Sequence, residues 1–302
     1  MKKKKYRDPN APGICSEIII NVIIMLFSLA CVIPFIFITI ISLTEEKSLM
    51  ANGYSFLPAE WSIEAFKYIF SGNGMIINSF MISVILVLVG TILGVTFSSM
   101  YAYTLFRKDY AFRKFFVWLS FITMIFSAGL VPTYVVMTQF FRLKDNIWSL
   151  ILPLLCSPFN IIILRTFYST SVPEALIESA KIDGSNEFRT FFKIIAPISL
   201  PGIATIALFY TLGYWNDWFN AMLYIDSLNK VPLQAFLMRI QSSLDLLKNS
   251  TGGVEALEQM QNMPSESARM ALVVIIVVPI AFAYPFFQKY FVSGLTVGAV
   301  KG

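Results

Sequence analysis

The sequence has no histidine among its 302 residues. This absence excludes nucleophilic sites built on Ser-His-Asp or Cys-His arrangements, and it excludes every metal site that needs an imidazole ligand. Only three cysteines are present, Cys15, Cys31 and Cys156, and they lie far apart with no Cys-x-x-Cys spacing. They are expected to be small packing residues rather than ligands or a disulfide framework. The sequence therefore predicts no metal site and no catalytic residue.

Charge is also scarce. Charged residues make up 14% of the chain and hydrophobic residues 57%, whereas an average soluble domain carries about 25% charged residues. A soluble fold of this composition would expose large apolar patches. The composition therefore predicts a membrane protein. The net charge of +5 requires no nucleic-acid partner, because the basic residues follow the membrane topology.

Long apolar runs occur six times, and each is long enough for a helix that needs about 20 residues to cross a bilayer. They are spans, not strands of a barrel, because the alternating segments of about 10 residues typical of barrels are absent. Gly90-x-x-x-Gly94 in the second run permits close helix contact. The predicted fold class is all-α, a polytopic membrane protein with six transmembrane helices. The six runs cover 18–43, 76–105, 115–140, 147–168, 198–224 and 270–293.

The distribution of Lys and Arg sets the predicted orientation. Basic residues concentrate in the N-terminal tail and in the segments that share its side, so the positive-inside rule places both termini in the cytoplasm. The first apolar run is too long for a signal peptide and is predicted to remain as a span. The chain then divides into a basic tail 1–17, a first helix 18–43, an outer loop 44–75, a core of five helices 76–293 with a cytoplasmic loop 169–197 and an outer loop 225–269, and a cytoplasmic tail 294–302.

The cytoplasmic loop 169–197 is the most informative segment. Pro173 suits the first position of a helix, Gly184 can end it in the left-handed conformation, and Ser185 can cap a second helix. On the first helix, Glu178 offers a charge, and the small residues Ser179 and Ala180 permit close approach by another protein. In the second helix an apolar stripe is predicted at helical spacing, formed by Phe188, Phe191, Phe192 and Ile195.

This loop resembles the EAA signature of ABC-importer permeases, on the residues Glu178-Ser179-Ala180, Asp183-Gly184, Pro197 and Pro201. It departs from the signature only by Ser179 in place of the middle alanine. Pro132-Thr133-Tyr134, Trp215-Asn216-Asp217 and the segment from Gln288 to Gly302 are similar to the carbohydrate-uptake, maltose-type branch. A generic amphipathic loop beside the membrane is the alternative, although chance alignment of Asp183-Gly184 is hard to obtain.

The resemblance implies the type I ABC-importer permease fold, in the plasma membrane of a bacterium, as part of an importer for an oligosaccharide. It implies that Glu178, Ser179, Ala180, Asp183 and Gly184 form a coupling site for an ATPase. The implied partners are a second homologous permease, two cytoplasmic ATPase subunits, an extracellular solute-binding lipoprotein and membrane lipid. This chain has no Gly-x-x-x-x-Gly-Lys-Ser/Thr loop for phosphates, so no cofactor is expected on it, and ATP and Mg are expected on the ATPase.

A polar and aromatic cluster in the fifth run is the candidate substrate path. An ionisable residue within a membrane is costly and usually faces a cavity or a partner. Aromatic faces and hydrogen-bonding groups suit a sugar, but interhelical hydrogen bonds within an interfacial aromatic belt explain the cluster equally well. The residues are Trp215, Asn216, Asp217, Trp218 and Asn220.

Two other functions compete with import driven by ATP. An ion-coupled secondary transporter would need intramembrane carboxylates and two related halves, but Asp217 is the only plausible buried acid and no repeat between halves is apparent. An intramembrane enzyme would need paired acids or a nucleophile with a base. The sequence therefore favours a transport subunit over an enzyme.

Overall fold

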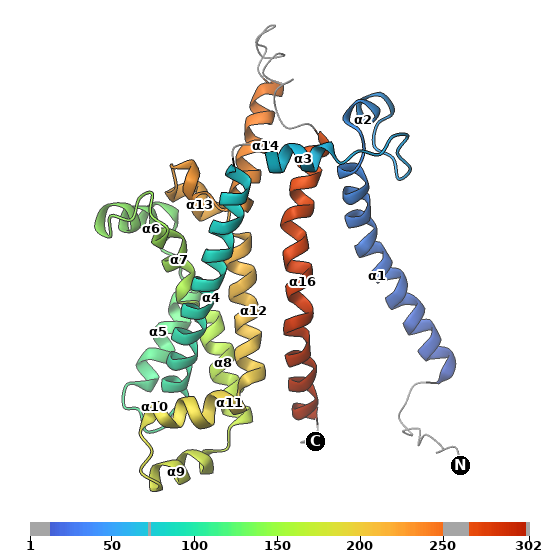
Figure 1. Ribbon diagram of the computed structural model, residues 1–302. Helices are drawn as coiled ribbons and strands as arrows, with labels where there is room; N and C mark the ends of the chain where they lie inside the picture. The colour runs from blue at the N-terminus through green and yellow to red at the C-terminus, as the bar shows by residue number, and fades with distance from the viewer. Residues whose placement is uncertain (1–12, 72–73, 250–265, 300–302) are drawn as a thin grey trace. The chain divides into compact units, whose positions relative to one another are not determined.

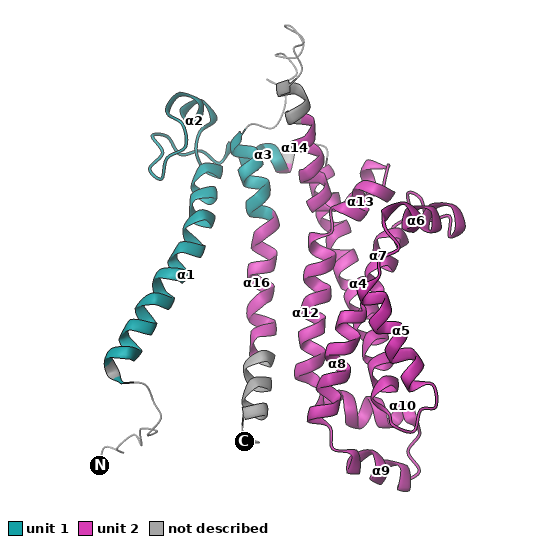
Figure 2. Ribbon diagram, turned by 180° about the vertical axis from the view of Figure 1, so that it is seen from behind, with its two compact units in different colours: residues 1–69, 264–275 teal, residues 70–263, 276–302 magenta. Residues whose placement is uncertain are grey.

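The protein is described by a computed structural model that covers residues 13–71, 74–249 and 266–299 (Figure 1). These residues form helices and connecting turns, and their only strand-like feature is an isolated bridge between Thr44 and Trp61. They divide into two compact units, which Figure 2 distinguishes by colour. Most of the predicted basic tail, the middle of the outer loop 225–269 and the last three residues lie outside the described part of the chain.

The first unit contains α1 (Ile14–Ser42), α2 (Glu46–Asn52), most of α3 (Glu64–Ser71) and the first turns of α16 (Glu266–Ala299). The Glu46 carboxylate holds the start of α16, because it accepts from the backbone N–H groups of Glu266 and Ser267 at 3.0 and 3.1 Å. An acid is favourable there because the first N–H groups of a helix have no partner within it. The short helix α2 thus fixes where α16 begins.

The second unit is built around α4 (Met75–Phe106), which packs along α12 (Leu200–Asn216) and α8 (Pro158–Ser171). The buried residues of α4 include small ones, among them Ser79, Ser83, Gly90 and Gly94. This unit also contains α16 from Ile276 onward. Its other α-helices are α5 (Arg113–Ile125), α6 (Leu130–Val135), α7 (Trp148–Leu155), α9 (Glu174–Ile182), α10 (Glu187–Thr190), α11 (Ala196–Ile198), α13 (Phe219–Tyr224) and α14 (Leu233–Asn249).

The predicted close contact at Gly90 and Gly94 is confirmed, and the partners are aromatic rings. A Cβ atom at Gly90 would lie 2.5 Å from the ring of Tyr214, and one at Gly94 would lie 2.8 Å from the ring of Tyr210. Both tyrosines belong to α12. The glycines therefore serve to seat two tyrosine rings against α4, and they do not bring two backbones together as in a glycine-paired helix dimer.

The same tyrosines bond to the backbone around a break between α7 and α8, which meet at 44°. The hydroxyl of Tyr210 donates to the carbonyl oxygen of Leu155 at 3.1 Å and accepts from the N–H of Ser157 at 3.3 Å. The hydroxyl of Tyr214 donates to the carbonyl oxygen of Ile151 at 2.9 Å. In lipid such freed backbone groups need partners from neighbouring helices, and α12 supplies them.

The spans are less continuous than the apolar runs predict. Within the described residues, three helices are long and apolar enough to cross a membrane, or up to six if each of three bent pairs counts as one span. The predicted fifth run, 198–224, divides into α12 and the separate α13, because the helix ends at Asn216. Residues Leu130–Phe140, which include the π-helical turn η1 (Val136–Phe140), bend by 113° from α5.

The cysteines differ from the sequence prediction. Cys15, Cys31 and Cys156 are free, and all three are exposed at the surface of the described chain. They are therefore not packing residues within this subunit. Exposure of an apolar thiol is not costly where the surrounding solvent is lipid, and Cys15 and Cys31 lie in the apolar helix α1.

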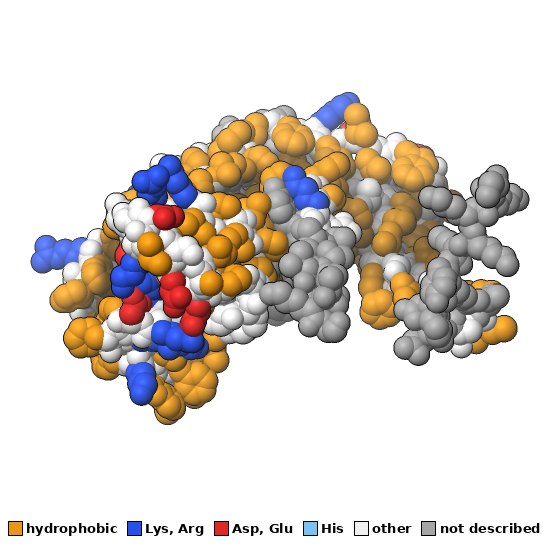
Figure 3. Space-filling view, turned by 90° about the horizontal axis from the view of Figure 1, so that it is seen from below, with side chains coloured by type: hydrophobic (Ala, Val, Ile, Leu, Met, Phe, Trp, Pro, Cys, Tyr) orange, Lys and Arg blue, Asp and Glu red, His pale blue; other side chains and the backbone are white. Residues whose placement is uncertain are grey.

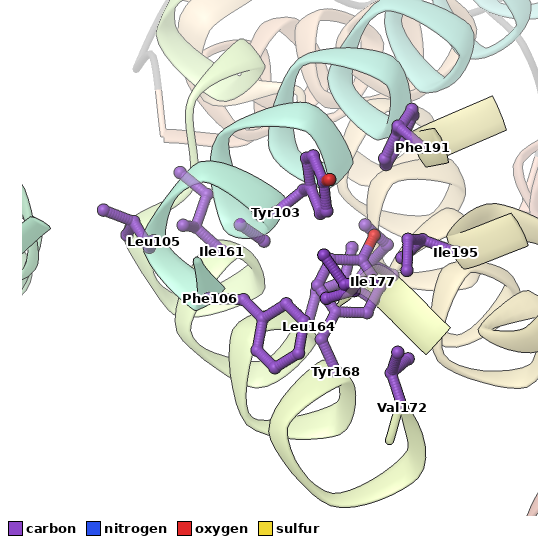
Figure 4. Packing of buried hydrophobic residues seen from close by; sticks show 12 residues of the cluster. Tyr103, Leu105, Phe106, Ile161, Leu164, Tyr168, Val172, Ile177, Phe191 and Ile195 are labelled. Atoms are coloured by element: carbon purple, nitrogen blue, oxygen red, sulfur yellow. The ribbon is translucent and has the colours of Figure 1, made fainter. Parts of the chain in front are cut away.

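A buried cluster closes the end of the second unit at which α9 lies (Figure 4). Phe106 from the end of α4 and Tyr168 from α8 form an aromatic pair with ring centroids 6.1 Å apart. Ile177 from α9 and Ile195 from the turn before α11 pack into the same cluster. The loop between α8 and α12 is thus a packed part of the subunit and does not hang free from it.

Candidate functional site

The first helix of the cytoplasmic loop, α9, ends as the sequence predicts, but it begins at Glu174, so Pro173 is its N-cap and not its first residue. Gly184 has a φ of 72°, in the left-handed region. The N–H of Gly184 bonds to the carbonyl oxygen of Lys181 at 3.1 Å, and the N–H of Ser185 bonds to that of Ala180 at 2.9 Å. This pair of bonds is a Schellman motif, which satisfies the last carbonyl groups of a helix. The geometry of the turn depends on a residue that tolerates positive φ.

The two faces of α9 differ sharply. Ile177 and Ala180 are buried, the latter with only 4% of its surface exposed, and Ile177 belongs to the cluster under the loop. Glu178 and Ser179 are exposed. The prediction that Ala180 faces outward for a partner is therefore wrong, because its methyl group points into this subunit. Ile182, which sequence reasoning missed, is 85% exposed on the last turn.

The second loop helix also departs from the prediction. Asn186, not Ser185, caps α10, and its side chain accepts from the N–H of Arg189 at 2.8 Å. A π-helical turn, η2 (Phe191–Ile195), follows and shifts the helical period. As a result the predicted single stripe is split, with Phe191 and Ile195 buried and Phe188 and Phe192 exposed.

A polar network that the sequence analysis did not single out joins this loop to the end of α4. The Oε2 atom of Glu187 accepts from the hydroxyl of Tyr103 at 2.7 Å and from Nη1 of Arg107 at 2.6 Å. Arg107 also donates from Nε to Asp109 at 2.9 Å. Because Arg107 donates to its carboxylate, the pKa of Asp109 lies below the ordinary value. The spacing of Tyr103 and Arg107, four residues apart on a helix, was the available signal.

Two further ion pairs connect α9 to the same segment. Lys108 pairs with Glu174 at 2.6 Å, and Lys181 lies 3.9 Å from Asp109. Both are exposed, and exposed pairs contribute little stability. These pairs help to fix the position of the loop, because three consecutive charged residues after α4 each contact a loop helix. Seen from below in Figure 3, basic and acidic side chains gather around this end of the second unit.

The candidate substrate-path residues do not form one lining. Trp215 is 7% exposed, its Nε1 donates to the carbonyl oxygen of Ile276 at 3.1 Å, and its ring packs edge-on against Phe80. The Asp217 carboxylate accepts from the N–H and the side-chain amide of Asn220, at 3.1 and 2.8 Å. Asp217 thereby holds the turn between α12 and α13.

The remaining candidates in this region differ in exposure. Asn216 is exposed at the end of α12, whereas Trp218 and Asn220 are half-buried. Among the residues that the structure describes, no cluster of His, Cys, Asp or Glu side chains could hold a metal ion.

Two bacterial proteins are similar in sequence to this chain over most of its length. The chain is 37% identical over 286 residues to the polygalacturonan/rhamnogalacturonan transport system permease protein YtcP of Bacillus subtilis, covering 95% of this chain and 98% of that one. It is 38% identical over 273 residues to protein LplC of the same organism, covering 90% of each. No family model matches the chain.

Among solved structures, a bacterial ABC transporter involved in the import of the acidic polysaccharide alginate has a chain with a TM-score of 0.79. Their sequences are 24% identical, and the match covers 95% of this chain and 100% of that one. This likeness shows the fold.

The apolar helices and the shared fold define a multi-pass membrane protein. On the sequence identity to its relatives, the chain belongs to the carbohydrate-uptake family of ABC-importer permeases. It is therefore a transport subunit of the plasma membrane and not an enzyme. Membership in this family implies a partner ATPase and a solute-binding protein.

Proposed function

We propose that the exposed face of α9 is the surface through which a cytoplasmic ATPase drives this permease. The observation that supports it is the division of α9 into a buried face, with Ile177 and Ala180, and an exposed face with Glu178, Ser179 and Ile182. A helix anchored on one side can transmit a push applied to the other. Asp183 and Gly184 set the turn that follows. ATP and Mg are bound by the ATPase, and this chain holds neither.

The substrate is an oligosaccharide. Relatives named for polygalacturonan/rhamnogalacturonan, arabinooligosaccharides and diacetylchitobiose transport support this class. A second homologous permease supplies the other half of the path, and two ATPases and an extracellular binding lipoprotein complete the importer. Both termini and α9 lie on the cytoplasmic side, as the excess of Lys and Arg in those segments favours.

The substrate path on this chain runs past the end of α12. Asn216 is the candidate for direct contact with a sugar, since it is exposed, whereas Trp215 is enclosed by Phe80 and the backbone of Ile276. Asp217, Trp218 and Asn220 shape the turn beside it. Replacement of Asn216 by Ala should raise the sugar concentration for half-maximal uptake without loss of assembly. Unchanged uptake kinetics would remove Asn216 from the path.

The coupling proposal is tested with Glu178→Lys in the complete importer. Reversing one charge of a desolvated interface pair costs at least the roughly 2–5 kcal/mol of truncating it, so the ATPase should co-purify in reduced amount and respond less to loaded binding protein. Lys193→Glu is the matched control, because Lys193 is exposed at the same end but lies outside α9. If the Glu178 variant keeps stoichiometric ATPase and full stimulation, α9 is not the coupling surface.

The orientation is tested by labelling. After Cys15, Cys31 and Cys156 are replaced by Ser, a single cysteine at Leu57 or at Lys193 is exposed to a membrane-impermeant maleimide in whole cells. Leu57 should react in intact cells and Lys193 only after permeabilisation. Reaction of both in intact cells would overturn the proposed topology.

A further inference from the structure

Two arginines from different helices meet at the end of α4. Nε of Arg113, the first residue of α5, lies 2.9 Å from the carbonyl oxygen of Leu105, and Nε of Arg165 in α8 lies 3.3 Å from the same oxygen. In the described part of the chain no carboxylate pairs with either one. A carbonyl in the last turn of a helix carries a share of only about half a negative charge. Two half-buried guanidinium groups are therefore left without charge compensation.

A cavity of about 430 Å³ opens beside Arg113. Its volume falls in the usual range of small-molecule sites, about 300–1,000 Å³. Lys108 and Glu174 on its wall pair with each other at 2.6 Å, so their charges offset. Arg113 therefore supplies the net positive charge of the cavity wall, which also includes Phe106 and the hydroxyl groups of Ser169 and Thr170.

The surface that leads away from this cavity is apolar. Phe115, Trp118, Ile122 and Ile125 are exposed along α5 at helical spacing, starting two residues after Arg113. The first turn of α5 contains two basic residues and no acid, the reverse of what the positive end of a helix favours. A ligand that suits the site thus combines an anion at the cavity with a long apolar part along α5.

We propose that this cavity binds the phosphate of an anionic phospholipid. Arg113 donates to the phosphate, Arg165 adds its charge from behind, and the acyl chains lie along Phe115 and Trp118. Basic pockets between helices at the cytoplasmic membrane surface hold lipid headgroups by this chemistry. The site lies at the end of the subunit that carries α9. Its assignment to the inner leaflet therefore rests on the proposed orientation, but the binding of the lipid phosphate does not depend on that orientation. The bound lipid would secure the end of α4 to which the loop helices are anchored.

The experiment counts lipids on the intact importer. The complex is purified, transferred to nanodiscs of phosphatidylethanolamine with or without phosphatidylglycerol, and analysed by native mass spectrometry and by titration with phosphatidylglycerol. Arg113→Gln should bind phosphatidylglycerol about 10-fold more weakly, since it removes one charge-assisted contact. Arg165→Gln should weaken binding by a smaller factor, since it removes a positive charge that does not touch the phosphate. Arg113→Lys, which keeps the charge, should retain most of the binding.

Arg189→Gln is the matched control, because Arg189 is exposed at the same end of the subunit and lines no part of this cavity. Equal phosphatidylglycerol binding by the wild type, the control and both arginine variants would overturn the proposal. Competition by millimolar inorganic phosphate without any need for acyl chains would also overturn it, since the site would then be for free phosphate. Recovery of binding in Arg113→Lys separates loss of charge from misfolding of the α5 start.

Discussion

Arg107 and Glu187 join the end of α4 to the start of α10 through a bond of 2.6 Å, and the hydroxyl of Tyr103 donates to the same carboxylate oxygen. The Arg107 side chain is 10% exposed and that of Glu187 is 62% exposed. A pair with one exposed partner contributes only about 0–1 kcal/mol to stability. The relationship therefore matters for where the loop sits more than for whether the protein folds.

Replacing Arg107 by Ala should loosen the loop while leaving the subunit assembled. We expect the melting temperature of the complex to change by only a few degrees. The ATP hydrolysed per sugar imported should rise, because the loop that carries α9 would follow the movement of α4 less closely. The measurement is the ratio of ATPase to uptake in proteoliposomes. Lys193→Ala serves as the control, and an unchanged ratio in Arg107→Ala would show that this contact does not position the loop.

Gly184→Val should misdirect the chain between the two loop helices. A Cβ at Gly184 would meet no other atom within 4 Å, so the cost is backbone strain alone, about 1–2 kcal/mol for a residue that resists left-handed geometry. Gly184→Asn should be nearly silent, since Asn tolerates that region. Sugar-stimulated ATPase activity of the two variants gives the comparison, and equal activity would mean that the turn tolerates another geometry.

Gly90→Ala and Gly94→Ala should destabilise the helix bundle. The added methyl groups would lie 2.5 and 2.8 Å from the rings of Tyr214 and Tyr210, and overpacking of this kind costs about 1–3 kcal/mol. Gly213→Ala is the control, because a Cβ there meets nothing within 4 Å. Thermal unfolding in detergent should rank the first two well below the control and the wild type.

Tyr210→Phe should cost less than either glycine change. The variant keeps the ring and loses the hydroxyl bonds at the break between α7 and α8, together with the bond of 2.6 Å between the hydroxyls of Tyr210 and Ser98. Hydrogen bonds between membrane helices contribute about 0.6 kcal/mol on average. The same unfolding measurement checks this order, and a larger loss for Tyr210→Phe than for Gly90→Ala would show that the bonds outweigh the packing.

The turn around Asp145 should show a defined pH dependence. Lys230 and Ser227 donate to the Asp145 carboxylate at 2.8 and 2.6 Å, and these bonds hold the pKa of Asp145 well below its usual value of about 4. A depressed pKa gives stability that is present above the unfolded pKa and is lost as pH falls toward the folded pKa. Asp145→Asn should thus lower the melting temperature near pH 7, and the difference should shrink below about pH 4. Asn tolerates the φ of 54° found at Asp145, so a pH-independent difference would exclude the carboxylate as the cause.

The sequence was informative where one residue determines local geometry. Gly184 ended α9 as predicted because its lack of a side chain leaves few alternatives for the turn, and the apolar runs marked the positions of the spans. The assignment of caps was less secure, since Ser185 and Asn186 both favour that position and only the packing of the following turn selects Asn186.

The long-range contacts could not be predicted from the sequence. The ion pair of Arg107 with Glu187 joins residues 80 positions apart, and no local pattern encodes which acid a basic residue will meet. The π-helical turn η2 likewise shifts Phe192 outward and Ile195 inward, which a fixed helical period cannot reproduce. The prediction that Ala180 permits close approach by a partner was wrong because contacts with the cluster under the loop, which are distant in sequence, determine which face of α9 is buried.

The bonds of Tyr210 to both sides of the break between α7 and α8 have a mechanical consequence. The two halves of a broken span can usually move relative to each other. Here the hydroxyl of Tyr210 bonds to both halves from a neighbouring helix, and its ring packs closely against Gly94. The helices α4, α7, α8 and α12 are thus expected to travel as a single rigid block during transport. The rotation needed to open and close the path must then take place at the rim of this block, where the chain turns by 113° after α5 and by 86° before α12.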